Sequence, residues 1–211
     1  MKKLLDLFCG AGGAGYGYHK AGFEVVGVDS VKKRAYPFEF IKADAMEILR
    51  DHEFLAQFDI IHASPPCQLY SVTGNLARAQ GKPSKKPNLL PEVRQLLESS
   101  GKPWIIENVV GAPMSGVILC GSMFGLKVRR HRIFESNHTL KTLTCDHKAQ
   151  GRPVGVYGSM NDEIPNGGRT AKTLREGQTA MGIDWMGWAN LKESIPPVYT
   201  EFLGRQLIES I

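Results

Sequence analysis

The chain has 211 residues, of which 42% are hydrophobic and 22% are charged. This length corresponds to one domain with a small appendage, and the composition excludes wholesale disorder. The net charge of +5 is uneven, because residues 76–103 contribute +4, residues 127–152 contribute +5, and the rest of the chain is acidic. Two local basic segments fit either a surface for a polyanion or two solvated loops.

The cysteines and the N-terminus indicate the compartment. Four cysteines are widely spaced and include no Cys-x-x-Cys pair, so we expect no disulfide framework and a reducing environment. Asp6 interrupts the first apolar run, so no secretory signal is predicted, and no apolar stretch approaches the ~20 residues that cross a bilayer. We expect a soluble protein of the cytoplasm with no membrane partner.

The first half of the chain alternates short apolar runs with longer amphipathic ones, as strands and helices do. Strands are predicted over Leu4–Phe8, Phe23–Val28, Phe38–Ile41, Phe58–Ala63 and Trp104–Ile106. Helices are predicted between them over Ala14–Ala21, Ala45–Phe54 and Pro91–Ser99. This alternation predicts an α/β fold with a parallel sheet.

The pattern changes after Gly111. Val117–Cys120 and Ile133–Phe134 are predicted strands, whereas residues 136–180 are polar, Gly-rich and without clear periodicity. So long a stretch is unusual as a structureless loop in a compact domain, and we expect a small irregular lobe or a segment ordered by a ligand. A helix over Leu203–Ile211 is predicted to close the chain.

A glycine-rich turn follows the first predicted strand. Residues 10–15 contain G-x-G-x-x-G, which lets a backbone approach a nucleotide closely. Asp29 follows the second strand and suits ribose hydroxyls, whereas Asp44 follows the third and suits an adenine amino group. These two acids favour an adenosyl ligand without a pyrophosphate. The turn alone also allows a dinucleotide oxidoreductase, with residues 32–34 holding a 2′-phosphate, or no ligand at all.

The most specific motif is Ser64-Pro65-Pro66-Cys67-Gln68, after the fourth predicted strand. In open α/β folds ligands bind beyond the carboxyl ends of strands, and two prolines stiffen the backbone that presents the thiol. An isolated cysteine is more often buried and inert, but this position favours function. Glu107 ends the fifth strand at the same edge and could bind a substrate ring nitrogen. Arg130 and Arg132 could hold a base carbonyl and a phosphate.

Four motifs in this order resemble the cytosine-5 DNA methyltransferase family: Asp6–Gly13, Pro65–Gln68, Glu107–Val109 and Arg130-x-Arg132. The resemblance covers about residues 3–135, and the small target lobe is similar to that of short phage and prophage methylases. It implies a Rossmann-like class I methyltransferase fold, a mostly parallel sheet with helices on both faces. It also implies a catalytic domain over 1–135 that binds S-adenosylmethionine, a short target-recognition lobe over 136–194, and a C-terminal helix over 195–211 that returns to the catalytic domain.

The resemblance also implies a role for each motif residue. Cys67 would add to carbon 6 of a cytosine flipped out of double-stranded DNA, and carbon 5 would then take the methyl group. Glu107 would pair with ring N3, Arg132 would bind the cytosine carbonyl, and Arg130 would support the catalytic loop and its phosphate. The cofactor site would comprise no metal and six residues: Phe8, Gly10, Gly12, Asp29, Asp44 and Pro66.

The chain departs from the family pattern at several places. Asp29 stands where Glu is common, Pro-Pro-Cys replaces the usual Phe-Pro-Cys, Val128 replaces a Gln, and the usual Gly-Asn of the last motif is missing near Ile195. The region between Glu135 and Ile195 is also far shorter than in most members of the family. We therefore expect sequence readout that is short, relaxed or supplied by a partner.

Three alternatives remain at this point. The same fold could methylate cytosine in tRNA or in a free nucleotide. An NAD(P)-binding oxidoreductase would explain the glycine turn but not Pro65–Gln68, and a non-catalytic DNA-binding relative would be expected to lack Cys67 or Glu107. Within the leading hypothesis we expect a monomer or small homo-oligomer, in a bacterium or a phage-infected cell, whose basic segments flank the active-site mouth.

Two further groups of residues lie in the second half. His138, Cys145 and His147 are close in sequence, and Cys120 or His131 could complete a tetrahedral zinc site. Their spacings match no standard zinc module, so solvated loop residues and no metal are expected. Two tryptophans, at positions 185 and 188, could stack on a base, but packing of the lobe onto the core is the favoured interpretation.

Overall fold

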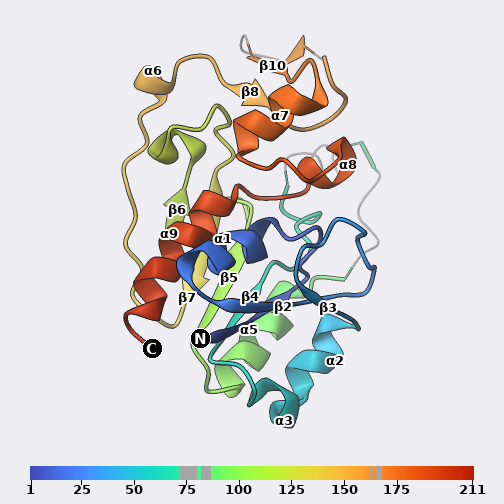
Figure 1. Ribbon diagram of the computed structural model, residues 1–211, viewed down its shortest axis with the longest axis vertical. Helices are drawn as coiled ribbons and strands as arrows, with labels where there is room; N and C mark the ends of the chain where they lie inside the picture. Colours follow the sequence, from blue (N-terminus) through green and yellow to red (C-terminus); the bar gives the residue numbers. More distant parts are fainter. Residues whose placement is uncertain (72–79, 82–86, 162, 165–167) are drawn as a thin grey trace.

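The computed structural model describes all residues except 72–79, 82–86, 162 and 165–167. A seven-stranded sheet in the order β3-β2-β1-β4-β5-β7-β6 forms its centre (Figure 1). The first five strands are parallel: β1 (Lys3–Leu7), β2 (Glu24–Asp29), β3 (Glu39–Lys42), β4 (Ile60–Ala63) and β5 (Trp104–Asn108). The strand β7 (Arg132–Ser136) runs antiparallel to both β5 and β6 (Val117–Leu119). The predicted fold class is confirmed.

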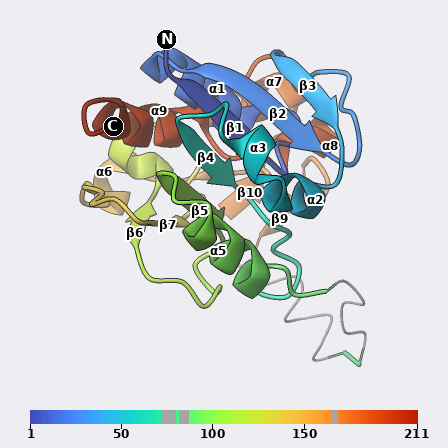
Figure 2. The ribbon, with the colours of Figure 1, turned by 90° about the horizontal axis from the view of Figure 1, so that it is seen from below.

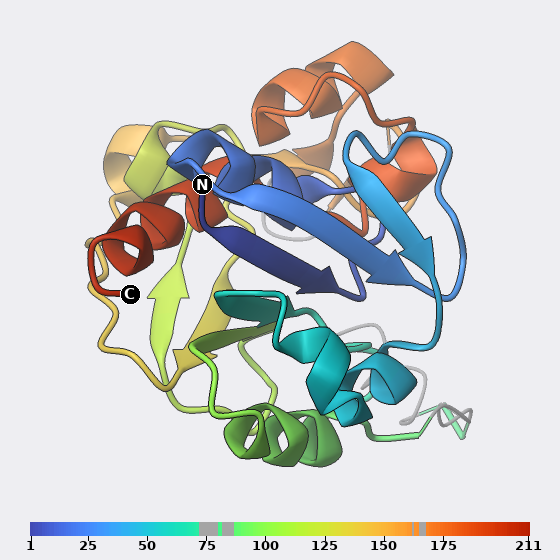
Figure 3. The same ribbon diagram turned by 60° about the horizontal axis from the view of Figure 1, so that its bottom comes forward.

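Helices cover both faces of this sheet (Figure 3). On one face lie α1 (Gly13–Ala21) and α9 (Pro197–Ile208), and on the other lie α2 (Ala45–Arg50), α3 (His52–Leu55) and α5 (Leu90–Ser99). In Figure 2, which is seen from below, α5, α3 and α2 lie on the face of the sheet that is turned toward the viewer. Leu5 and Leu7 of β1 pack toward this second group, whereas Leu4 packs toward α1 and α9. A central strand covered on both faces is mostly apolar at consecutive positions, and β1 was predictable because only Asp6 interrupts its leucines.

Two helices differ from their predicted bounds for local reasons. The run predicted as one helix over Ala45–Phe54 is divided at Asp51, whose side chain accepts a hydrogen bond from Phe54 N at 2.9 Å and so caps α3. The last helix starts at Pro197, six residues before its predicted start. Proline is favoured in the first turn of a helix because that turn leaves its N–H groups unpaired.

The segment predicted to be irregular contains short regular elements. A three-stranded sheet has the order β8-β10-β9, and the helices α6, α7 and α8 lie around it. Strands of two or three residues are too short to show a period in sequence, which is why they were not predicted. The elements of this part of the chain are η1 (Gly121–Phe124), α6 (His147–Gln150), β8 (Val154–Gly155), β9 (Glu163–Ile164), β10 (Gly168–Thr170), α7 (Leu174–Met181) and α8 (Trp188–Leu191). Among the described residues, no helix has the length and apolar character needed to span a membrane.

The closest helix packing in the fold joins α1 to α9. A Cβ atom built on Gly17 would lie 2.0 Å from the carbonyl oxygen of Pro197 and 2.1 Å from Oγ1 of Thr200. The Thr200 hydroxyl is buried and donates to the Ala14 carbonyl at 2.7 Å. The backbones therefore approach so closely that only glycine fits at position 17.

We expect Gly17→Ala to lower the free energy of unfolding by about 2 kcal/mol, because the helices must separate to admit the methyl group. This loss should exceed the gain in helix propensity of roughly 1 kcal/mol. Urea denaturation measures the change. The matched control is Lys20→Ala in the same helix, which removes an ion pair to Glu201 and a cation–π contact with the Tyr16 ring. The lysine side chain is exposed, so stability should change by less than about 1 kcal/mol. Equal effects of the two substitutions would contradict the steric explanation.

Candidate functional site at the carboxyl edge of the sheet

A cleft of about 1210 Å³ lies beyond the carboxyl ends of β1, β2, β4 and β5 and is bordered on its other side by residues 151–157. It brings together most of the residues singled out in the sequence. Those that line it are Phe8, Gly10, Asp29, Pro66, Cys67, Glu107, Arg130 and Arg132.

The glycine turn after β1 is held in a left-handed backbone conformation. Phe8, Gly10 and Gly12 have φ angles of 57°, 53° and 87°. Asp29, at the end of β2, accepts hydrogen bonds from the backbone N–H of Gly10 and of Val31, each at 3.0 Å. A Cβ on Gly10 would meet nothing within 4 Å, so the open space of the cleft reaches this backbone. The turn can therefore accept a ligand in close contact, and the Asp29 carboxylate at its edge has further lone pairs to offer.

Asp44 has a different environment from Asp29. Its side chain accepts a hydrogen bond from Met46 N at 2.7 Å and caps α2. Asp44 is exposed, and the lining of the cleft formed by the described residues does not include it. Its predicted contact with an adenine amino group therefore stays a prediction, whereas its role as a helix cap is observed.

The Pro-Pro-Cys turn is fastened to the neighbouring strand. The buried Asn108 side chain, at the end of β5, donates from Nδ2 to the Pro65 carbonyl at 3.0 Å. Cys67 is half-buried and faces the cleft. Burial raises the pKa of its thiol, and Glu107 raises it further, whereas Arg132 lowers it. Cys67 is therefore a neutral thiol until a substrate or a base assists the loss of its proton.

Glu107 and Arg132 form an ion pair in the cleft. Arg132 Nε lies 3.0 Å from Glu107 Oε1, and the antiparallel pairing of β5 with β7 fixes the two side chains near each other. Burial raises the pKa of Glu107, and Arg132 opposes that shift. A carboxyl with a raised pKa can hold a proton and donate it to a ring nitrogen, with a guanidinium beside it for a neighbouring oxygen.

Arg130 makes a different set of contacts from Arg132. Its backbone has a φ of 35°, and its guanidinium donates to the carbonyls of Val156, Lys192 and Ser194. Tyr199 of α9 donates its hydroxyl to the Arg130 carbonyl at 3.0 Å. Arg130 thus joins three distant segments at the border of the cleft.

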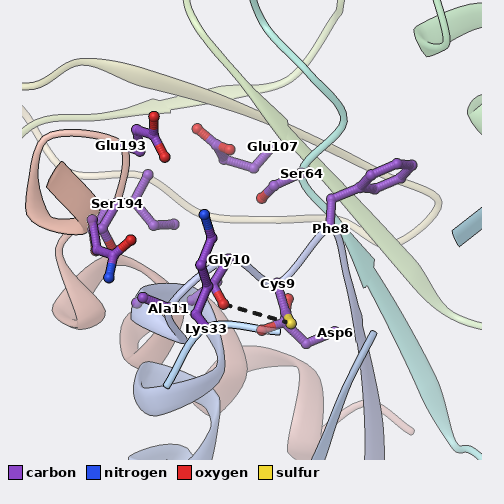
Figure 4. Close-up of a pocket in the computed structure, with 14 residues that line it drawn as sticks. Asp6, Phe8, Cys9, Gly10, Ala11, Lys33, Ser64, Glu107, Glu193 and Ser194 are labelled. Atoms are coloured by element: carbon purple, nitrogen blue, oxygen red, sulfur yellow. Dashed lines mark hydrogen bonds between the residues drawn. The ribbon is translucent and has the colours of Figure 1, made fainter. Parts of the chain in front are cut away.

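A smaller pocket of about 80 Å³ adjoins the glycine turn (Figure 4). Lys33, Glu107 and Glu193 point into it. The residues that sequence reasoning missed here are in one wall, formed by Asn190, Glu193, Ser194 and Ile195. No motif marks them in the sequence, because the usual Gly-Asn of the family's last motif is missing near Ile195. The one feature of the sequence related to this wall is the glycine at position 13. A Cβ atom there would lie 1.9 Å from Ser194 Oγ, so the glycine indicates that another segment packs closely against the turn.

Trp185 packs the lobe onto the core as predicted, whereas Trp188 packs within the lobe. Trp185 lies against the Tyr16 ring with 4.3 Å between ring centroids, and its indole N–H donates to the Ala11 carbonyl at 3.1 Å. Trp188 donates to the Gly158 carbonyl at 3.0 Å. Both indole N–H groups are therefore occupied within the protein, and Trp185 joins the lobe to the glycine turn.

A buried polar group lies directly beneath the glycine turn. Asp6 is fully buried, and neither of its carboxylate oxygens has a hydrogen-bond partner among the described residues. Burial raises its pKa to about 8, with smaller contributions from Asp29 and Glu107. His62 lies opposite Asp6 on the neighbouring strand β4. Burial lowers the pKa of His62 to about 3, and its ring forms hydrogen bonds with the hydroxyl groups of Tyr18 and Ser64. Both side chains are therefore neutral near pH 7, as their surroundings require.

The fold and this site define a class of protein, the Rossmann-like methyltransferases. A methyltransferase from Entamoeba histolytica, EhMeth, has a solved structure that superposes with a TM-score of 0.64 over 100% of this chain and 98% of that one, at 14% identity. A candidate DNA modification methyltransferase encoded within an Escherichia coli prophage superposes with a TM-score of 0.61 over 99% of both chains, also at 14% identity. At such identities the likeness concerns the fold.

The sequence comparison is more specific. Residues 2–115 match the model of the family described as C-5 cytosine-specific DNA methylase, and the chain belongs to this family. The type II methyltransferase M.FnuDI of Fusobacterium nucleatum is 35% identical over 117 residues, which are 52% of this chain. That match covers 33% of M.FnuDI, so the chain spans about a third of the length of this relative.

The raised pKa of Asp6 predicts a pH-dependent stability. The folded pKa of about 8 lies above the ordinary value of 3.8, so the folded state keeps a proton that the unfolded chain releases. Protonated Asp6 makes its full contribution to the free energy of unfolding below about pH 4. That contribution is lost as the pH rises to 8, at up to about 1.4 kcal/mol per pH unit. Asp6→Asn has no proton to lose at this position, so its stability should not fall for this reason. The difference in the free energy of unfolding between the variant and the wild type should therefore shift in favour of the variant from pH 5 to pH 8.

Denaturant titrations at each pH measure this difference. The matched control is Glu53→Gln, which changes an exposed acid and should follow the wild-type pH dependence. Parallel curves for Asp6→Asn and the wild type would show that Asp6 is ionised in the folded protein.

Proposed function

We propose that the protein transfers a methyl group from S-adenosylmethionine to carbon 5 of cytosine in double-stranded DNA. The observation that carries the proposal is the cleft in which Cys67, Glu107 and Arg132 meet, with Arg132 Nε 3.0 Å from Glu107 Oε1. Membership of the cytosine-specific methylase family supports the choice of base and of reaction. Action in a bacterial or phage-infected cytoplasm is part of the same proposal.

The residues around the glycine turn fit the adenosyl cofactor. The space above Gly10 is open, and the Asp29 carboxylate faces the cleft from the end of β2. Phe8, Gly10, Gly12, Asp29 and Pro66 would hold the cofactor, and Asp44 would reach its adenine only if the cap of α2 allows it. When bound, the cofactor supplies an electrophilic methyl group.

The side chains of the cleft can make cytosine reactive. Sγ of Cys67, after losing its proton, forms a bond to carbon 6 while the electron pair of the C5=C6 bond moves toward N3 and carbon 5 becomes nucleophilic. Glu107 donates its proton to N3 as that pair arrives, and Arg132 binds the carbonyl oxygen beside it. After methylation, water in the open cleft takes the proton of carbon 5. The electron pair of that C–H bond re-forms the C5=C6 double bond and expels the thiolate, which regains a proton from water, and N3 returns its proton to Glu107.

The charge of the cleft favours a polyanion over a free nucleotide. Three acidic residues line it, against six basic ones: Lys33, Arg129, Arg130, Arg132, Arg152 and Lys192. Phosphates along a strand are the partner that such a surface prefers. Part of the basic segment 76–103 lies outside the described residues, so this reasoning rests on the segment 127–152 and its neighbours. An RNA substrate is the second candidate, because the same charges favour it.

The reaction can be tested with duplex DNA in which 5-fluorocytosine replaces cytosine. After methylation the adduct resolves only if the substituent at carbon 5 leaves as a cation, which hydrogen can do and fluorine cannot. We expect a protein–DNA adduct that survives denaturing electrophoresis and requires S-adenosylmethionine. Cys67→Ser should abolish it, and Glu107→Gln should slow its formation about 10²–10⁴-fold.

Calorimetric binding of S-adenosylmethionine serves as the control in that experiment. Cys67→Ser should bind the cofactor as the wild type does, which separates loss of the nucleophile from loss of the fold. Label transfer from the cofactor to tRNA, but not to DNA, would favour the second candidate. Transfer to dCMP alone would contradict the preference for a polyanion. An adduct that survives Cys67→Ser would contradict the proposal.

The basic border of the cleft gives a separate prediction. Arg152 is exposed and lines the cleft, where we expect it to contact a phosphate. Arg152→Ala should weaken DNA binding and reduce the slope of log K against log salt by about 1. Arg205→Ala, on an exposed part of α9 away from the cleft lining, should leave the slope unchanged. Equal slopes for both variants would show that Arg152 does not contact a phosphate.

A further inference from the structure

Four potential metal ligands converge beside the sheet, outside the cleft. Cys120 directly follows β6, His131 directly precedes β7, and Cys145 and His147 lie at the start of α6 (Figure 1). One ligand atom from each of the four lies within 4.8 Å of every other, among the residues that the structure describes. His138, which the sequence placed nearest to Cys145 and His147, is not in this group and instead contacts Asn137.

The distances fit one tetrahedral ion. Cys120 Sγ lies 3.4 Å from His147 Nε2, and Cys145 Sγ lies 3.6 Å from His131 Nε2. Zinc bonds of ~2.3 Å to sulfur and ~2.0–2.1 Å to nitrogen place the ligand atoms of a tetrahedron about 3.3–3.8 Å apart. The remaining pairs, all within 4.8 Å, need only a small contraction to reach that geometry.

We propose that Cys120, His131, Cys145 and His147 bind one Zn²⁺ ion as a structural site. Two thiolates and two neutral imidazoles match the preference of zinc for sulfur and nitrogen ligands, and two negative charges balance that of the ion. With four protein ligands the coordination is closed, so no position remains for a substrate. This proposal replaces the expectation of solvated loop residues, which rested on sequence spacing alone.

The surroundings of the ligands support a single ion. Cys120 is fully buried, and the Ser122 hydroxyl donates toward its sulfur at 3.3 Å. Hydrogen bonds of this kind orient metal ligands and stabilise a thiolate. A two-iron cluster with the same residue types would place the cysteines on one iron and the histidines on the other. Here all four ligand atoms lie within 4.8 Å of one another, which fits the ligands of a single ion.

The ion would add a direct link between two parts of the chain that already meet through the Gln150 side chain, which donates to the Leu126 and Val128 carbonyls. Cys120 and His131 belong to the ends of strands in the central sheet, whereas Cys145 and His147 begin the segment that leads into the lobe. His131 lies between Arg130 and Arg132, so metal binding would fix the backbone that positions both arginines. This last consequence rests on the proposed function, whereas the metal site itself does not.

Elemental analysis of the full chain, purified without chelators, tests the site. We expect one zinc per chain in the wild type, and close to none in Cys120→Ser and Cys145→Ser. Two variants should keep one zinc per chain: His138→Ala, which alters the nearby histidine outside the cluster, and Cys67→Ser, which alters the cysteine of the cleft. The proposal is overturned if the wild type binds no zinc after purification and after incubation with Zn²⁺.

Cobalt spectroscopy keeps the test valid if the cysteine variants fail to fold. Co²⁺ added to the metal-free wild type should give the intense visible bands of tetrahedral coordination and thiolate-to-metal charge-transfer bands. Weak octahedral bands, or a Cys120–Cys145 disulfide in the protein as isolated, would contradict the proposal. Failure of the proposed function has a different signature, because a protein that holds zinc but forms no adduct through Cys67 would fail only the methylation test.

Discussion

The ion pair between Arg132 and Glu107 is the interaction on which the site depends. Glu107 is almost fully buried, and a lone carboxylate there would be costly to ionise. Arg132 offsets that cost, while burial keeps the pKa of Glu107 raised. The balance leaves a carboxyl that can exchange a proton beside a permanent positive charge. Such a pair suits a planar ring that carries a nitrogen next to a carbonyl. The antiparallel pairing of β7 with β5 places Arg132 beside Glu107.

The two arginines of the motif make different kinds of contact: Arg132 pairs with a carboxylate of the cleft, and Arg130 holds segments of the backbone together. Arg132 faces Glu107, whereas Arg130 bonds three backbone carbonyls from the lobe and from the segment before α9. A guanidinium is well suited to this because its donors form a fixed planar fork. Removing it would take a donor from the carbonyl of the buried Val156. The positive φ of Arg130 shows that the surrounding contacts determine the backbone at this residue.

The first half of the fold was predictable because its strands, apart from the edge strand β3, are buried on both faces. Leu4, Leu5 and Leu7 form a short apolar run that only the buried Asp6 interrupts. The residues at the ends of such strands, including Asp29 and Glu107, meet at one edge of the sheet. The lobe was not predictable in detail, because strands as short as Val154–Gly155 carry no period. The four proposed metal ligands were all named from the sequence, but sequence distance also selected His138 and offered Cys120 and His131 as alternatives. The pairing of β6 with β7 instead brings both Cys120 and His131 to the cluster. Glu193 and Ser194 were missed because tertiary packing alone places them against Gly13.

The contact between Gly13 and Ser194 has a consequence for how the protein matures. The glycine turn is synthesised well before residues 192–195, which supply its wall and partners of Arg130, and before α9, which packs on α1. These are contacts of very high sequence separation, and such contacts slow the folding of a chain. A nascent chain that ends before residue 192 would therefore have neither the Ser194 wall of the smaller pocket nor the Lys192 and Ser194 carbonyls that hold Arg130.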